Sequence, residues 1–248
     1  MFFDIKRKEL KWDEFLDYYE PYYFINDKPK LFERNRKNLN QTSYFVESQI
    51  ENILNDGLNP RDIILVIAWK LGMIDHYNSD ECNNIIYKND FSKYMIYKRY
   101  SEVKLLPMVN YIKDNFKELN DLAENDPYSL FKKLCENRVK GFGSTYILTL
   151  VFFFTGGSMP IYDKYVNMAL WAFKNNLVPD TGKVIKIKEI PELNYLPQDI
   201  DRAWDYYQGY VGDLKRISNP DIITRRGDRA LWVYGHGFAT DTKARVCR

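Results

Sequence analysis

Cysteine and histidine are scarce in this sequence, and their scarcity excludes two kinds of site. The three cysteines, Cys82, Cys135 and Cys247, are far apart and odd in number. Widely spaced cysteines with no Cys-x-x-Cys pair predict neither a disulfide framework nor a zinc site. Only two histidines, His76 and His236, are present, so a histidine-rich metal centre is not expected. The sequence therefore predicts no metal and no cofactor.

Long hydrophobic runs are also missing. The longest covers residues 147–154, which is far too short to span a bilayer. The first residues, MFFDIKRKELKWDEF, mix charges and contain no apolar stretch of the signal-peptide kind. We therefore expect a cytoplasmic protein with reduced cysteines and no membrane contact, and we expect it to be a monomer.

A strong excess of either charge is absent too. The net charge is +2, from 36 Lys and Arg against 34 Asp and Glu. Phosphate binding needs only local basicity, and basic residues cluster at 6–8, 28–37, 183–188 and at Arg225, Arg226 and Arg229. Such a cluster is more often a solvated face than a binding site. The aromatic content of 16% suits either a tyrosine-rich core or a stacking surface for bases.

The hydrophobic pattern predicts an all-α fold. Residues 44–55 have apolar residues on one helical face, and residues 63–73 are apolar nearly all round, which indicates a central buried helix. Residues 184–190 instead alternate apolar and charged side chains between prolines, so we expect a small extended excursion near 181–197, with a short hairpin as one form. Further helices are predicted over 91–97, 103–116 with a break or kink near Pro107, 128–137, 144–154, 163–174, 199–211 and 220–233.

One stretch, residues 138–170, combines two features that carry chemistry. A Gly141-Phe142-Gly143 turn precedes a strongly apolar helix. A tight turn that exposes backbone N–H groups at the start of a helix binds phosphate. The segment Pro160-Ile161-Tyr162-Asp163 then opens the next helix, and Asp163 lies twenty residues after Gly143. Asp163 is a natural N-cap, which is the usual role of an aspartate at a helix start.

Together the turn and Asp163 resemble the motif of the helix-hairpin-helix superfamily of base-excision DNA glycosylases. The motif of the 8-oxoguanine and adenine glycosylase branches reads roughly Pro-Gly-Val-Gly followed by Pro-hydrophobic-x-Asp. The likeness aligns residues 141–166 without a gap. It implies a single glycosylase unit over residues 1–248, built of two interlocked helical lobes around a central cleft, with residues 127–174 carrying the hairpin and the catalytic segment. It also implies double-stranded DNA with a damaged or modified base as the partner.

The resemblance assigns roles to particular residues. Asp163 takes the place of the family's catalytic carboxylate. Thr145 stands where lyase-competent members carry a lysine, which implies a monofunctional enzyme that forms no Schiff base. Lys140 and Lys164 lie nearby in sequence, so lyase activity stays open. The DNA-binding residues implied by the hairpin are Lys140, Gly141, Phe142, Gly143, Ser144 and Thr145.

Two departures and one absence qualify the likeness. Lys140 stands where the family often has proline, and Ile147 replaces a small residue that lets the hairpin helices pack closely. No cysteine cluster follows the motif, so the iron–sulfur cluster of some relatives is not expected.

The chemistry suits these residue types. Cleavage of an N-glycosidic bond develops positive charge on the sugar, which an ionised Asp163 would stabilise while it orients or deprotonates a water. The base must leave the stack and enter a pocket against aromatic side chains. Wall residues considered are Trp69, Lys70, Trp232 and Tyr234, and general acids considered are Glu47, Asp75 and Asp80; core packing is the commoner role for each wall residue.

Three functions remain open from the sequence. The first is a monofunctional DNA glycosylase, acting either in repair or in defence against phage with modified DNA. The second is a non-catalytic DNA-binding module that keeps the hairpin. The third is an unrelated helical protein in which both motifs are coincidental. The sequence does not identify the excised base.

Overall fold

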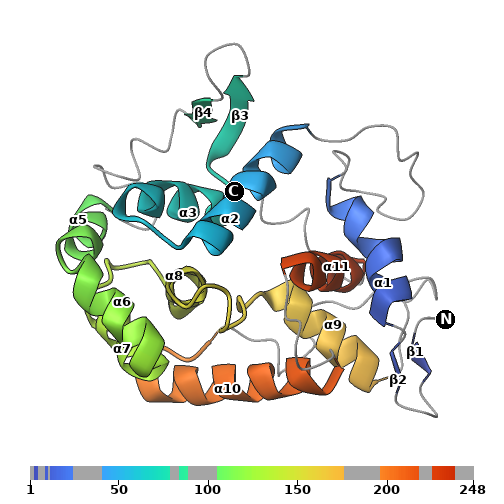
Figure 1. Cartoon of the computed structure of the whole chain (residues 1–248). Helices are drawn as coiled ribbons and strands as arrows, with labels where there is room; N and C mark the ends of the chain where they lie inside the picture. The colour runs from blue at the N-terminus through green and yellow to red at the C-terminus, as the bar shows by residue number, and fades with distance from the viewer. Residues whose placement is uncertain are drawn as a thin grey trace. The chain divides into compact units, whose positions relative to one another are not determined.

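A computed structural model describes residues 3–4, 9–10, 12–24, 41–78, 84–88, 105–175, 196–217 and 225–237. Most of these residues are α-helical, which confirms the predicted class at that level (Figure 1). The α-helices are α1 (Trp12–Tyr19), α2 (Gln41–Asp56), α3 (Ile63–Lys70), α5 (Leu106–Asp114), α6 (Phe116–Asn125), α7 (Pro127–Glu136), α8 (Ser144–Phe154), α9 (Lys164–Lys174), α10 (Ile200–Ile217) and α11 (Arg225–His236). Two 3₁₀ helices are η1 (Glu20–Phe24) and η2 (Pro60–Asp62).

The chain divides into two compact units whose segments alternate along the sequence. The first unit comprises residues 1–40, 162–196 and 206–248, and the second comprises residues 41–161 and 197–205. The Gly-Phe-Gly turn belongs to the second unit and Asp163 to the first.

Helix α8 is the centre of the second unit. All of its residues from 147 to 154 are buried, and it packs against α3, α6 and α7. Burying a large apolar side chain stabilises a fold by about 1.5–3 kcal/mol, so this helix anchors the core. The sequence had suggested residues 63–73 for this central place. Instead α3 ends at Lys70 and buries one face, with Ile64 and Leu65 only half-buried.

The first unit is built on the packing of α11 against α9, α1 and η1. Its core is aromatic: the ring of Tyr234 lies 4.7 Å from that of Phe173 and 5.5 Å from that of Phe15, between ring centroids. Helices α9 and α11 approach so closely that a Cβ atom on Gly235 would lie 1.8 Å from the carbonyl oxygen of Tyr165. Only glycine fits at that position.

Two antiparallel strand pairs were not predicted. Strand β1 (Phe3–Asp4) pairs with β2 (Glu9–Leu10), and β3 (Ile74–Asn78) pairs with β4 (Asn84–Tyr87), with an irregular register between Ile74 and His76. These strands are too short for their alternation to stand out in the sequence. Helix α2 packs on β3, which gives that strand pair a helical neighbour.

The predicted kink near Pro107 is wrong. Pro107 lies in the first turn of α5, where its missing N–H costs no hydrogen bond. The helix breaks instead at Asn115, whose side-chain Nδ2 donates to the carbonyl of Tyr111 at 2.8 Å. Asparagine competes with the helical ladder by such bonds, so α5 and α6 are separate helices.

Several predicted segments lie outside the described residues. These are the helix over 91–97, the excursion over 181–195 and the basic clusters at 6–8, 28–37 and 183–188. Leu196 and Pro197, the end of the predicted excursion, are described and form no strand.

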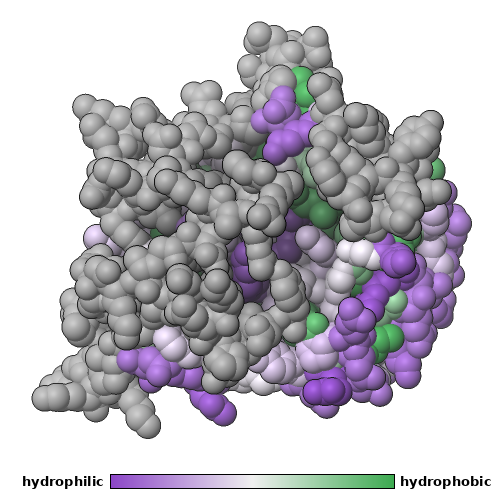
Figure 2. Space-filling model, turned by 180° about the vertical axis from the view of Figure 1, so that it is seen from behind, coloured by the Kyte–Doolittle hydropathy of each residue, from purple (hydrophilic) through white to green (hydrophobic). Residues whose placement is uncertain are grey.

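The described surface is largely hydrophilic on the face shown in Figure 2, with separate small hydrophobic spots. Among the described side chains, the exposed large hydrophobic ones are Tyr44, Leu106 and Tyr206. None of the described helices has the length and hydropathy needed to cross a membrane, and no group of metal-ligating side chains gathers within the described ranges.

The contact at Gly235 gives a stability prediction. Substitution Gly235→Ala puts a methyl group 1.8 Å from the Tyr165 carbonyl oxygen and 3.0 Å from the Ala169 nitrogen. We expect it to lower the free energy of unfolding by about 3 kcal/mol or more, since overpacking at backbone leaves no side chain to move aside. Urea denaturation measures the change.

The matched control is Gly209→Ala on α10, where nothing lies within 4 Å of the added Cβ. That change is expected to stabilise by about 0.5–1 kcal/mol, because alanine favours a helix over glycine. Equal stability of both variants would contradict the close approach of α11 to α9.

Candidate functional site

The turn between α7 and α8 forms a braced hairpin in the second unit. Gly141 has φ +89°, a conformation that disfavours side chains, and the Phe142 N–H donates to the Val139 carbonyl at 3.0 Å. Arg138 braces the base of the hairpin, since its Nη1 donates to Ser144 Oγ at 3.0 Å and lies 3.4 Å from Cys135 Sγ. The loop between the helices is therefore held in one conformation.

The hairpin presents backbone donors at the start of α8. The carbonyl of Gly143 accepts from the N–H groups of Tyr146 and Ile147, at 2.9 and 3.3 Å. Within the part of the chain that the structure describes, no acceptor lies against the N–H groups of Gly143, Ser144 and Thr145. Unbonded first-turn N–H groups together with the helix dipole attract an anion.

The side chains of the hairpin divide into buried and exposed ones. Phe142 is buried and stacks on Tyr146 with ring centroids 4.9 Å apart, and Ser144 is buried against Arg138. Of these two residues, Phe142 already donates its N–H to Val139, so only the Ser144 N–H is left for a ligand. Lys140, Gly141 and Gly143 are exposed, and Thr145 is half-buried. The exposed face of the hairpin thus carries one cation and a row of amides.

Asp163 is the N-cap of α9 in the first unit. Its backbone is extended, and its Oδ1 accepts a hydrogen bond from the Tyr165 N–H at 2.8 Å. The carboxylate is half-buried. The capping role expected from the sequence is confirmed, and the cap bond fixes one carboxylate oxygen beside the first turn of α9.

Two buried tyrosines, Tyr162 and Tyr210, lie near this cap. Tyr162 packs on Tyr210 with ring centroids 5.0 Å apart, and Tyr210 stacks on Tyr207 at 6.2 Å. Burial raises the pKa of Tyr162 to about 12. Burial also raises the pKa of Tyr210, and the negative charges of Asp228 and Asp163 raise it further. The negative charge of Asp163 therefore reaches the phenol of Tyr210, which lies in a poorly hydrated environment.

A second aromatic group contacts Tyr165 in the first turn of α9. The ring of Tyr165 is 4.5 Å from His236 and 5.5 Å from Trp232, between centroids. The Lys164 ammonium lies 4.6 Å from the centroid of the Tyr165 ring. Of these residues the sequence suggested only Trp232 for a base pocket and Lys164 for lyase chemistry. The others were missed because nothing in their spacing links α9 to α11.

The remaining sequence candidates are placed as follows. Trp69 is half-buried on α3, and its Nε1 donates to Glu47 Oε1 at 3.1 Å, so these two residues form one pair. Lys70 is half-buried and Asp75 is exposed. Trp69 and Lys70 lie in the second unit, whereas Trp232 and Tyr234 lie in the first. Tyr234 is a core residue, and Asp80 lies outside the described residues.

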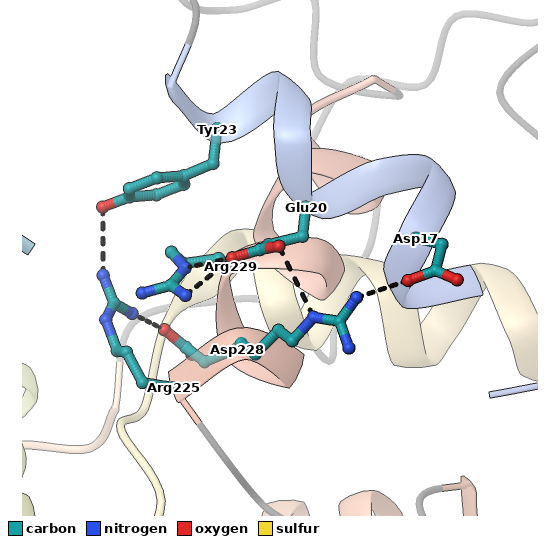
Figure 3. A network of polar contacts seen from close by, with 7 residues as sticks. Asp17, Glu20, Tyr23, Arg225, Asp228 and Arg229 are labelled. Carbon is teal, nitrogen blue, oxygen red and sulfur yellow. Dashed lines mark hydrogen bonds and ion pairs between the residues drawn. The ribbon is translucent and has the colours of Figure 1, made fainter. Parts of the chain in front are cut away.

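The arginines of α11 form ion pairs, not a basic patch (Figure 3). Arg225 pairs with Asp228 and donates to the Tyr23 hydroxyl at 3.0 Å. Arg229 donates to Glu20 through Nε at 3.0 Å and Nη2 at 2.6 Å. Arg226 contacts Asp17 and Glu20 as well. The suggestion that these arginines bind DNA phosphates is not supported, because carboxylates of α1, η1 and α11 already neutralise them.

Cys135, at the end of α7, is a buried free thiol. Burial raises its pKa to about 11, which the nearby Arg138 partly offsets. A thiol that stays protonated is a poor nucleophile, so Cys135 belongs to the core.

Comparisons of the chain with protein-family models, with curated proteins and with solved structures find no match.

The buried phenols near Asp163 predict a loss of stability at high pH. A phenol whose pKa is raised in the folded state keeps its proton while the unfolded chain loses it. The contribution of such a phenol to the free energy of unfolding is therefore fully present below pH 10. For Tyr162 it is lost as the pH rises from 10.0 through its folded-state pKa of about 12. Each such phenol contributes a slope of up to about 1.4 kcal/mol per pH unit.

Urea unfolding at several pH values, followed by circular dichroism and by tyrosinate absorbance, measures this effect. We expect tyrosinate to appear together with unfolding, and Tyr162→Phe to reduce the slope. Full ionisation of every tyrosine in a chain that keeps its native spectrum would contradict the burial of these phenols.

Proposed function

We propose that the protein is a monofunctional DNA glycosylase of the helix-hairpin-helix type. It hydrolyses the N-glycosidic bond of a flipped damaged or modified base and leaves an abasic site, in base excision repair or in defence against phage with modified DNA. The observation that carries the proposal is the braced hairpin, whose amides at the start of α8 have no acceptor among the described residues, followed along the chain by the capping carboxylate of Asp163. An arrangement of two helical lobes around a cleft is part of the proposal.

The hairpin supports DNA binding of the sequence-independent kind. Its free N–H groups and the helix dipole suit one phosphate, and the exposed Lys140 adds a cation beside them. Contacts to phosphate fix the register of a protein on DNA without reading its sequence. The modest net charge of +2 agrees with phosphate binding at one local site rather than along a broad basic face.

Asp163 supports the hydrolytic step. An ionised carboxylate held by the Tyr165 N–H would face the sugar with a fixed negative charge. Such a preorganised charge stabilises the cation that develops as the base leaves. The same carboxylate would orient a water, or accept its proton, for attack on the sugar carbon.

Thr145 supports hydrolysis without lyase chemistry, because a threonine hydroxyl forms no Schiff base. Lys164, the nearest lysine in sequence to Asp163, has its ammonium against the face of Tyr165. Of the suggested wall residues, Trp232 suits the base pocket better than Trp69, since Trp232 lies in the same unit as Asp163 and packs on Tyr165.

One observation favours the non-catalytic DNA-binding module as the second candidate. The cap bond to Tyr165 is by itself a sufficient reason for an aspartate at position 163. The two candidates differ in whether DNA chemistry depends on this carboxylate.

Substitution Asp163→Asn separates them. Asparagine caps a helix about as well as aspartate, so the fold is retained while the charge is lost. We expect the rate of abasic-site formation to fall at least about 100-fold, as measured by alkaline cleavage of duplexes under single-turnover conditions.

The matched control is Asp126→Asn. Asp126 is the N-cap of α7, and its Oδ1 accepts from the Ser129 N–H at 3.1 Å. We expect this variant to keep the wild-type rate. An equal loss in both variants would indicate a folding effect, and an unchanged rate in Asp163→Asn would refute a catalytic role.

DNA affinity tests the hairpin separately. Lys140→Gln is expected to weaken binding to any duplex and to lower the slope of log affinity against log salt by about one, since one phosphate contact is lost. Lys117→Gln, an exposed lysine of α6 in the same unit, is the control and should leave the slope unchanged. Equal effects of the two changes would mean that the hairpin has no special part in binding.

A further inference from the structure

A continuous set of contacts joins the segment after α1 to Asp163, and all of it lies within the first unit. Arg225 Nη2 donates to the Tyr23 hydroxyl at 3.0 Å (Figure 3). The ring of Tyr23 packs edge-to-face on Trp232, with centroids 5.5 Å apart and planes at 77°. Tyr23 thus has a fixed polar end and a fixed apolar face.

The contacts continue from Trp232 to the first turn of α9. Trp232 packs on Tyr165 at 5.5 Å and on His236 at 4.7 Å, and His236 packs on Tyr165 at 4.5 Å, between centroids. His236 is buried. Two residues one turn apart on α11 therefore hold the ring of Tyr165.

The backbone of Tyr165 is held as closely as its ring. Its carbonyl oxygen lies against Gly235, where a Cβ atom would be 1.8 Å away. Its N–H donates to Asp163 Oδ1 at 2.8 Å. Any shift of Tyr165 moves the donor that orients the carboxylate, so the position of α11 sets the position of that oxygen.

The Arg225 end of this set is rigid for an electrostatic reason. The Arg225 side chain is 6% exposed and pairs with Asp228, which is 14% exposed. A guanidinium presents its donors in a fixed planar fork, and at this burial a lost acceptor is costly. Arg225 also lies 5.4 Å from the centroid of the Tyr23 ring. The hydroxyl of Tyr23 therefore has one preferred place.

We propose that Tyr23 and Arg225 are positioning residues for the Asp163 carboxylate, acting through Trp232 and Tyr165. The role of Asp163 in catalysis rests on the proposed function; the positioning itself is a property of the first unit. Neither residue touches the carboxylate. Their part is to hold the aromatic face of α11 against the turn that Asp163 caps.

Hydrogen exchange of single amides, followed by NMR without DNA, tests the positioning. In Tyr23→Phe, which removes only the hydroxyl, the Tyr165 N–H should exchange about fivefold faster, the effect of losing one hydrogen bond. The amides of Asn175, at the other end of α9, and of Ser129, in the matching cap of α7, should exchange as in the wild type. Tyr22→Phe, a buried neighbour on η1, is the control variant and should change none of the three.

Two results would overturn the proposal: a change of less than about twofold at Tyr165, or an equal acceleration at Asn175, which would indicate general loosening of the unit. A second variant, Arg225→Lys, keeps the charge but loses the fork. It should accelerate Tyr165 exchange to a similar degree, and the double variant should add little more, because both changes break one link.

Activity gives a separate readout. On a DNA substrate, Tyr23→Phe should lower the single-turnover rate about fivefold with unchanged DNA affinity, in parallel with the exchange at Tyr165. Faster exchange at Tyr165 in a chain whose wild type releases no base would support the positioning and refute the proposed function. Normal exchange with reduced activity would refute the positioning and leave the function standing.

Discussion

The close packing of α11 on α9 is the constraint on which the first unit depends. At Gly235 the two backbones meet with no room for a side chain. That contact brings aromatic residues of α11 onto Tyr165, whose N–H donates to the carboxylate of the N-cap residue Asp163. The ion pair of Arg229 with Glu20 and the hydrogen bond of Arg225 to Tyr23 then tie the same helix to η1, and the ion pair of Arg226 with Asp17 ties it to α1. Breaking a buried ion pair leaves an uncompensated charge, so these pairs restrict α11 to one placement.

The helices around the motif are the part of the fold that the sequence predicts best. The apolar helix α8 and the cap at Asp163 could both be predicted from the sequence, because helix boundaries depend on local residues such as Gly143 and Asp163. The strand pair β3–β4 was not legible, since its strands are short and its partner contact is with α2. The sequence predicted the helix break at Pro107, but the helix ends at Asn115, where the Asn115 side chain bonds to the Tyr111 carbonyl. The arginines of α11 looked like a basic cluster because three of their partners, Asp17, Glu20 and Tyr23, lie some 200 residues earlier in the chain.

The proposed function needs a phosphate-binding hairpin and a catalytic carboxylate, and these two sites differ in physical character. The hairpin offers first-turn amides that have no acceptor among the described residues, together with the exposed cation of Lys140, and these suit a strongly hydrated, charged backbone. Asp163 is half-buried near phenols whose pKa burial raises, and in such surroundings a fixed charge acts more strongly than in water. Binding and chemistry are therefore separable by mutation. The identity of the base depends on a pocket that the residues near Asp163, with Trp232 and Tyr165 foremost, would have to supply.

The most direct measurement is mass spectrometry of the small molecules released when the wild-type chain is incubated with DNA. The panel would contain duplexes with 8-oxoguanine, uracil, mispaired adenine or alkylated bases, together with naturally modified phage DNA. If the protein is a monofunctional glycosylase, one free base is released in an amount equal to that of the alkali-labile sites, the strands stay uncut before alkali, and borohydride traps no adduct. Binding to every duplex without release of any base would contradict that function and leave the hairpin as a DNA-binding element alone.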